Sequence, residues 1–242
     1  MEKCKFYQLF VNGNTADLHI YGDITSDAAV LKNIFGEDLP VISANDIVKE
    51  LNGLKVKTIN VYINSYGGEV AEALAIYSAL KRHPARIHTF CDGFACSAAS
   101  IVFCAGSQRT MGTLSLLMIH NCMSNVGYAN SEEMRKAADD NDKINQSSIN
   151  AYKAATGMKE DQIKELMDAE TWFTAEEALQ FKFATDIAEI NREPGTATQQ
   201  SGFRAVRQQI LQGRGHVPGG SRGTGYKNKY AENFSKMLNT MK

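Results

Sequence analysis

The sequence alternates between strand-like and helix-like segments from residue 57 to residue 120, and this alternation restricts the fold more than any other feature. Residues 57–64 (KTINVYIN) alternate in polarity and are rich in β-branched side chains, which predicts a strand. Residues 69–82 repeat apolar side chains at helical spacing until Pro84 ends the pattern. Residues 86–91 predict a second strand and residues 97–105 a buried helix. Because strands that alternate with helices are typical of parallel βαβ units, we predict an α/β fold.

The segments on either side of this region add further elements. Asn12-Gly13-Asn14 separates two strand-like runs, 5–11 and 18–24, and Asn-Gly is a strong hairpin signal. Further elements are expected at 43–51 (helix, with Ser43 as N-cap), 108–111 (strand), 114–120 (apolar run), 161–167 (helix), 175–181 (helix, with a Thr174–Glu177 capping box) and 184–190 (strand).

Residues 131–155 predict a long helix of unusual polarity. Its apolar positions are sparse, and charged residues from Asp139 to Lys143 interrupt them. Such a helix cannot bury a broad face in its own domain. We therefore expect either a solvated arm or a surface for a partner.

The sequence changes character after Glu193. Residues 191–242 hold nine Lys or Arg and two acids, a charge of +7, and because the whole chain carries −1, residues 1–190 carry −8. Eight of the 19 glycines lie between Gly195 and Gly225. This composition predicts a flexible, largely disordered basic tail, with a brief helix at most over 228–242. We therefore divide the chain into a folded domain, 1–190, and a tail, 191–242.

The cysteine pattern and the lack of other motifs exclude several classes of function. The five cysteines include no CxxC pair and no Cys/His cluster at metal spacing, so we expect reduced thiols in a cytoplasmic protein and no metal. The sequence contains no GxGxxG or phosphate loop, and no apolar run long enough to span a bilayer. We expect no cofactor, no nucleic acid and no membrane as partners, and we see no signal peptide.

Ser97 lies where a predicted strand turns into the predicted helix 97–105. The backbone N–H of Ala98 would be one of the unpaired donors at the helix start. That placement suits a nucleophile that forms an oxyanion beside a fixed donor. The alternative is that Ser97 only caps the helix.

Two further features fall at predicted strand ends, where sites collect in parallel sheets. His120 ends an apolar run, and imidazole is the usual general base for a serine. The pair Gly67-Gly68 follows a strand and would let the backbone approach a ligand closely. The alternatives are a histidine satisfied within the core and an ordinary tight turn. A histidine base also needs an orienting acid, and Asp168 and Glu170 are candidates, unless both are solvated loop acids.

Taken together, these stretches resemble the proteolytic subunit of the Clp protease (ClpP), and within that family the ClpP-like head maturation proteases of tailed phages and prophages. The resemblance covers about residues 21–190. The stretches that carry it are 63–68 (INSYGG), 93–100 (GFACSAAS), 118–121 (MIHN) and 168–178 (DAETWFTAEEA).

The resemblance implies a ClpP/crotonase-like fold and a serine endopeptidase that works through an acyl-enzyme. It makes Ser97 the nucleophile and His120 the general base, with the N–H groups of Gly68 and Ala98 as the oxyanion hole. Glu170 stands where the family has its acidic third member, an aspartate, and Asp168 is the alternative acid. The segment after Gly68 and residues 123–128 would bind substrate as added strands.

The resemblance also implies an assembly. The family forms heptameric rings stacked face to face, which implies a tetradecamer here, and residues 131–155 match the handle helix that interleaves between rings. Residues 1–10 do not resemble the axial loops through which ClpP contacts its AAA+ unfoldase, which argues against dependence on such a partner. The basic tail has no counterpart in housekeeping ClpP, and Tyr66 replaces the usual proline.

Three other hypotheses stay open. Cys96, beside Ser97, could supply a thiol nucleophile. The chain could be a non-catalytic assembly or scaffold protein that keeps the ring, with substrate chains as binding partners only. It could also be an acyl-CoA hydratase or isomerase of the same fold, which needs no serine–histidine pair.

Overall fold

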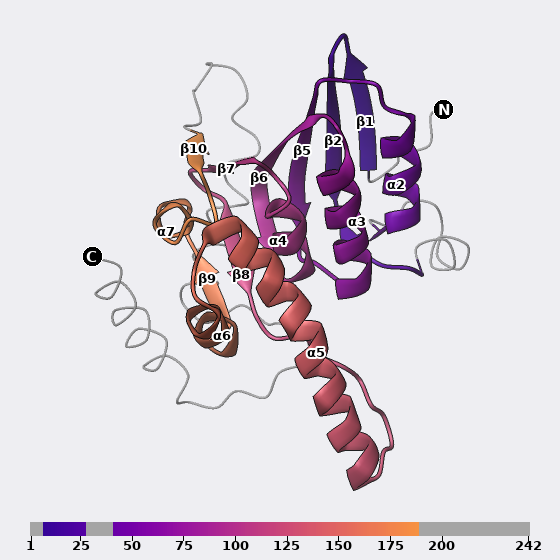
Figure 1. Cartoon of the computed structure of the whole chain (residues 1–242), viewed down its shortest axis with the longest axis vertical. Helices are drawn as coiled ribbons and strands as arrows, with labels where there is room; N and C mark the ends of the chain where they lie inside the picture. Colours follow the sequence, from indigo (N-terminus) through magenta and orange to yellow (C-terminus); the bar gives the residue numbers. More distant parts are fainter. Residues whose placement is uncertain (1–6, 28–40, 189–242) are drawn as a thin grey trace. The chain divides into compact units, whose positions relative to one another are not determined.

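A computed structural model describes residues 7–27 and 41–188, and within them eight strands form one sheet (Figure 1). The order along the sheet is β1-β2-β5-β6-β7-β10, with β8 beside the second half of β6 and β9 beside β8. The strands are β1 (Tyr7–Asn12), β2 (Thr15–Tyr21), β5 (Thr58–Ser65), β6 (Arg86–Cys96), β7 (Gln108–Gly112), β8 (Leu116–Ile119), β9 (Thr171–Phe173) and β10 (Asp186–Ala188). A separate parallel pair joins β3 (Asp23–Ile24) to β4 (Val41–Ile42).

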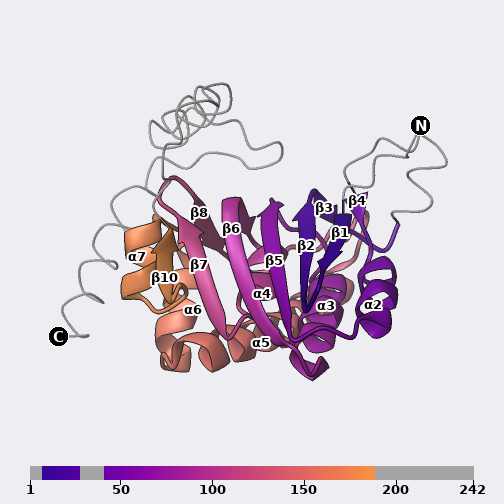
Figure 2. The same cartoon turned by 90° about the horizontal axis from the view of Figure 1, so that it is seen from above.

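The sheet is parallel except at β1/β2 and β8/β9, so the predicted α/β fold of βαβ units is confirmed. The helices are α2 (Ala44–Gly53), α3 (Val70–Arg82), α4 (Ala98–Phe103), α5 (Ser131–Thr156), α6 (Glu160–Asp168) and α7 (Ala175–Gln180). Figure 2 shows α2, α3 and α4 on one face of the sheet. Every second residue of β5 is buried against this face, while Tyr62 on the other face stacks between His19 and Phe90.

The predicted end of the strand at 86–91 is wrong, and this error affects the segment that leads to Ser97. The strand expected at 86–91 continues to Cys96, so Asp92 and Gly93 lie inside β6 and not beyond its end. Strand β6 changes partner on its way: His88 to Cys91 pair with β7, whereas Phe94 to Cys96 pair with β8. The register with β5 also shifts between Ile63 and Ser65. A glycine inside a strand is typical of such an irregularity, and the local sequence did not distinguish it from a turn.

Other boundaries shift by a few residues. The strand expected at 18–24 is divided by Gly22 into β2 and β3, and the helix expected at 97–105 is shorter. The capping box at Thr174 is confirmed, because its hydroxyl accepts from the Glu177 N–H. The tail expected at 191–242 lies outside the described residues.

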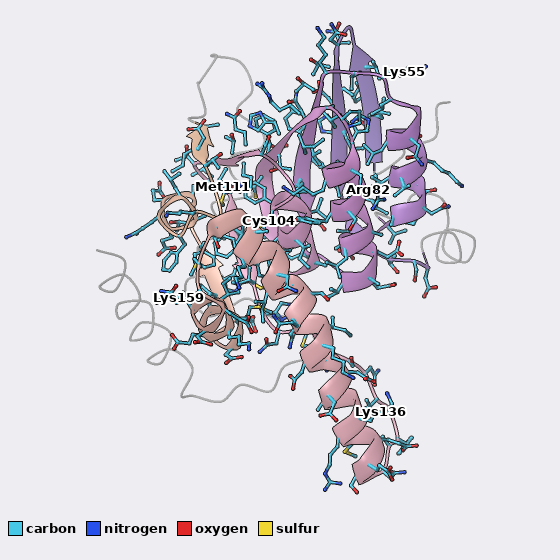
Figure 3. All side chains as sticks on the ribbon, in the orientation of Figure 1. Lys55, Arg82, Cys104, Met111, Lys136 and Lys159 are labelled. Atoms are coloured by element: carbon cyan, nitrogen blue, oxygen red, sulfur yellow. The ribbon has the colours of Figure 1, made fainter. Side chains whose placement is uncertain are left out.

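The long helix α5 is confirmed, and it is buried only toward its C-terminal end. A capping box at Asn130 begins it, and Gly157, at φ 72°, ends it. Its buried residues all belong to the last third of the helix (Ser148, Ile149, Ala151, Tyr152, Thr156). The other end extends away from the sheet, as Figure 1 shows, and Figure 3 places Lys136 there, 2.5 Å from Asp140.

Arg109 fixes the buried end of α5 to the sheet. This buried side chain donates hydrogen bonds to four backbone carbonyls, those of Phe183 (2.7 Å), Gly106 (3.1 Å), Ala155 (3.0 Å) and Lys182 (3.0 Å). The carbonyl of Ala155 belongs to the last turn of α5, where unpaired carbonyls favour a cation. In residues 7–27 and 41–188, no helix combines the length and the apolarity that a membrane crossing requires.

Candidate active site

Ser97 joins β6 to α4 in a backbone conformation that costs energy. Its φ is 53° and its ψ is −125°, a backbone region that residues other than glycine rarely occupy. The Ser97 N–H donates to the Met118 carbonyl of β8 at 2.8 Å. Ser97 occupies the N-cap position of α4, but its hydroxyl makes no capping hydrogen bond, so the interpretation that this side chain only caps the helix is wrong.

The Ser97 hydroxyl instead faces His120. The distance from Ser97 Oγ to His120 Nε2 is 2.7 Å. This contact follows from the sheet, because β6 and β8 run in parallel and end at the same edge, with Cys96 beside Met118. The expected convergence of strand ends therefore brings Ser97 and His120 together, 23 residues apart in the sequence.

The surroundings of His120 favour its neutral form. Burial lowers the pKa of His120 below the ordinary 6.5, and the negative charge of Glu170 partly opposes this shift. A neutral imidazole with its proton on Nδ1 presents an unprotonated Nε2 to the Ser97 hydroxyl. At neutral pH this ring can therefore accept the serine proton.

Gly67 lies against Ser97 and Gly68 against Ile24, and neither glycine can be replaced by a larger residue unless its neighbours move. A Cβ at Gly67 would lie 2.6 Å from the Cys96 carbonyl oxygen and 2.8 Å from Ser97 Cβ, and a Cβ at Gly68 only 2.0 Å from the Ile24 carbonyl oxygen. Both glycines also have positive φ, 104° and 136°. An ordinary tight turn would require neither close approach.

The contact with β3 fixes the direction of the Gly68 peptide. Ile24 donates its N–H to the Gly67 carbonyl and accepts from the Glu69 N–H, both at 2.8 Å. In extended backbone, neighbouring residues point their polar groups to opposite sides, so the Gly68 N–H faces away from β3. Across the described ranges, neither the Gly68 N–H nor the Ala98 N–H donates to a protein group. Both remain available to a ligand.

The carboxylate of Glu69 holds the same segment in place. It accepts hydrogen bonds from the Thr25 hydroxyl (2.6 Å), the Ser26 N–H (3.0 Å) and the Ser26 hydroxyl (2.8 Å). The loop after β3 is thereby joined to the residue that follows the glycine pair. No sequence pattern indicates this contact, because its partners are separated by 43 or 44 residues.

The two candidate acids have different partners. Asp168 accepts a hydrogen bond from the Asn121 side chain at 2.7 Å, whereas Glu170 acts on His120 through its charge. Within the part of the chain that the structure describes, the His120 ring bonds to no carboxylate. Glu170 therefore stays a predicted third member of the triad, and Asp168 the alternative.

Burial argues against a thiol nucleophile. Cys96 is 1% exposed, and desolvation raises the pKa of its thiol, so the thiolate does not form at neutral pH. Burial likewise raises the pKa of Cys91 and of Cys104 to about 12. Among the described residues, no three His, Cys, Asp or Glu side chains are placed to hold a metal ion.

Comparisons with a family model and with individual known proteins match the chain to the same family. The family described as Clp protease matches residues 18–191. The ATP-dependent Clp protease proteolytic subunit 2 of Thermobifida fusca is 29% identical over 163 residues, which cover 66% of this chain and 75% of that protein. Subunit 3 of Rhodococcus jostii is 32% identical over 140 residues, which cover 55% and 69%.

A solved structure gives the same fold. The chain is similar to a ClpP1 mutant from Listeria monocytogenes, with a TM-score of 0.59 and 22% identity, over 73% of this chain and 92% of that one.

Proposed function

The chain belongs to the Clp protease family, and from this premise we propose that it is a serine endopeptidase with Ser97 as nucleophile and His120 as general base. The observation that supports these roles most is the 2.7 Å contact between Ser97 Oγ and His120 Nε2. The half-buried, neutral imidazole and the two free N–H groups of Gly68 and Ala98 complete the arrangement that acyl transfer requires.

The reaction proceeds in two halves. Ser97 Oγ attacks the substrate carbonyl carbon while its proton passes to His120 Nε2, and the resulting oxyanion accepts hydrogen bonds from the Gly68 and Ala98 N–H groups. The carbon–nitrogen bond then breaks, and His120 gives its proton to the leaving amine. Water attacks the acyl ester of Ser97, His120 takes a proton from it, and the carboxyl product leaves as the Ser97 hydroxyl re-forms.

The extended segment expected after Gly68 is absent, because α3 begins at Val70 and the Glu69 N–H already donates to the Ile24 carbonyl. Substrate would therefore lie as an added strand along residues 123–128, after His120. The side chains of Met123, Val126 and Tyr128 are 84%, 44% and 111% exposed, so they are available for apolar contact. Binding through main-chain hydrogen bonds selects little for side chains and suits unfolded or tethered chains.

We propose that α5 builds a ring assembly of stacked heptamers. The part of α5 that precedes its buried last third exposes the apolar side chains of Met134 (52%) and Ile144 (37%). The segment after His120 is tied to the same helix, since Asn145 accepts from the Cys122 N–H at 2.8 Å and Asn141 from the Ser124 hydroxyl at 2.6 Å. Substitution of Met134 by Glu should therefore reduce the assembled mass in native mass spectrometry, whereas a monomeric wild type would contradict the assembly.

Two tasks fit this activity. The relatives are named as proteolytic subunits of ATP-dependent proteases, which favours degradation of chains that an AAA+ unfoldase delivers. The +7 tail at 191–242 favours instead a dedicated maturation of phage head proteins, capsid or scaffold, in which the tail docks on acidic partners or is itself cleaved. Intact mass spectrometry of wild type and Ser97→Ala after incubation decides whether the tail is cleaved by this chain. We place the activity in a reducing cytoplasm, which the free thiols of the four cysteines within the described residues support.

The activity is tested with unfolded protein. Wild type should release fluorescent peptides from labelled casein without ATP, and Ser97→Ala should not. Hydration of an enoyl-CoA by Ser97→Ala would favour the acyl-CoA hypothesis. Normal rings without cleavage of casein would favour the scaffold hypothesis.

A further inference from the structure

A buried tyrosine of α5 is linked to the backbone of Ser97 by two hydrogen bonds. The Tyr152 hydroxyl lies 2.8 Å from Ser100 Oγ, and Ser100 Oγ donates to the Ser97 carbonyl at 2.6 Å. Tyr152 is 1% exposed and Ser100 0%. These two hydrogen bonds therefore connect α5 to the candidate nucleophile through the buried interior.

The direction of both hydrogen bonds follows from proton counting. A carbonyl oxygen only accepts, so the single proton of the Ser100 hydroxyl points to Ser97. Tyr152 must then donate to Ser100 Oγ. Burial raises the pKa of Tyr152, so its phenol keeps this proton. A hydroxyl that accepts one hydrogen bond becomes a better donor in the next, which strengthens the hold on the Ser97 carbonyl.

Holding this carbonyl also orients the N–H on the same peptide. The Ser97–Ala98 bond is trans, and a trans peptide is planar, with its C=O and N–H pointing in opposite directions. The Ser97 carbonyl receives a second hydrogen bond from the Ser100 N–H at 3.0 Å. The Ala98 N–H therefore points away from Ser100, where no protein group of the described residues accepts it.

We propose that Tyr152 and Ser100 are positioning residues that aim the Ala98 N–H at the developing oxyanion. The inference rests on the proposed function, because the direction of this N–H matters only if Ser97 forms a tetrahedral adduct. It explains how Ser97 keeps its costly φ of 53° and ψ of −125°, since hydrogen bonds hold the peptides on both sides of the residue. The Ser97 N–H donates to the Met118 carbonyl, and the Ser97 carbonyl accepts from the N–H and the hydroxyl of Ser100.

Tyr152→Phe removes only the hydroxyl. The ring keeps its edge contact with Phe183, whose centroid lies 5.6 Å away, so the core stays packed. Ser100→Ala removes the side-chain donor to Ser97 itself. Tyr77→Phe is the matched control, because it removes a hydroxyl from a half-buried tyrosine of α3 that forms no hydrogen bond through that group in the described structure.

The readout compares a peptide ester with its thionoester, using enzyme whose active Ser97 has been titrated. Sulfur is a poor hydrogen-bond acceptor, so the thionoester gains little from an oxyanion hole. Since loss of one oxyanion donor costs about 100-fold or more in kcat, a misdirected donor should cost Ser100→Ala about tenfold on the oxygen ester. For Ser100→Ala we expect KM and the rate on the thionoester to stay within twofold of wild type. Tyr152→Phe should show a smaller fall in kcat on the oxygen ester, and Tyr77→Phe should leave kcat unchanged.

The double variant Tyr152→Phe/Ser100→Ala tests whether Tyr152 acts on Ser97 through Ser100. If Tyr152 acts through Ser100, Tyr152→Phe has no further effect on kcat once Ser100 is Ala. Equal losses on both esters, fully multiplicative effects, or wild-type kcat in Tyr152→Phe would each overturn the proposal while the protease activity stands. If Ser100→Ala does not fold, the kcat of Tyr152→Phe on the two esters tests the proposal alone. A wild type that hydrolyses neither ester would overturn the proposed function and this inference together.

Discussion

Asn121 donates a side-chain hydrogen bond to Asp168 at 2.7 Å, so this carboxylate contacts the residue that follows His120. Glu170, two residues further along, is the acid whose charge acts on the imidazole. Glu170 is therefore our predicted third member of the triad, where the resemblance implies an aspartate, and Asp168 stays the alternative.

Replacing each acid by its amide separates the two candidates. Glu170 raises the pKa of His120, so Glu170→Gln should lower that pKa. Since only the neutral imidazole accepts the serine proton, the acid limb of kcat/KM against pH, already below 6.5, should move to lower pH. Asp168→Asn, the matched control, should leave the limb in place. The opposite pattern would assign the role to Asp168.

A methyl group at Gly68 should abolish most activity without unfolding the chain. The added Cβ would meet the Ile24 carbonyl oxygen at 2.0 Å, so the peptide that carries the Gly68 N–H must move. We expect kcat to fall by about 100-fold or more, as for loss of an oxyanion donor. Gly53→Ala is the control, because its Cβ meets nothing within 4 Å. Near-normal turnover by folded Gly68→Ala would remove this N–H from the mechanism.

Arg109 should matter for stability and not for chemistry. Arg109→Met removes the donors to four buried carbonyls, and we expect a loss of about 3 kcal/mol or more in the free energy of unfolding. For a domain of this size that corresponds to a melting temperature lower by roughly 6–12 °C. Thermal unfolding followed by circular dichroism measures it, with exposed Arg82→Met as control. Equal melting temperatures for the two variants would contradict this account.

The sequence predicted the fold well wherever one periodic pattern covered a whole element. The alternation at 57–64 and the helical spacing at 69–82 correspond to β5 and α3 within one residue. The path of β6 was missed, because its change of partner from β7 to β8 depends on strands that follow it in the sequence. That same change of partner is what brings Ser97 beside His120.

In the candidate site, the sequence likewise predicted the residues at strand ends but not the contacts that support them. Ser97, His120 and the glycine pair could be found because each ends a predicted strand, and strand ends meet at one edge of a parallel sheet. The supporting contacts of Glu69 with Thr25 and of Tyr152 with Ser100 join residues 44 and 52 positions apart. Neither pair stands out in the sequence, since Tyr152 occupies an ordinary apolar helix position and Ser100 lies among small residues.

The most direct test is intact mass spectrometry of the full chain after exposure to a fluorophosphonate, with peptide mapping of the adduct. A fluorophosphonate modifies only a serine that a base has activated. The account predicts one adduct per chain, on Ser97, absent from Ser97→Ala and formed at least about 100-fold more slowly in His120→Ala. A folded, assembled wild type that forms no adduct at Ser97, or that reacts no faster than His120→Ala, would contradict it.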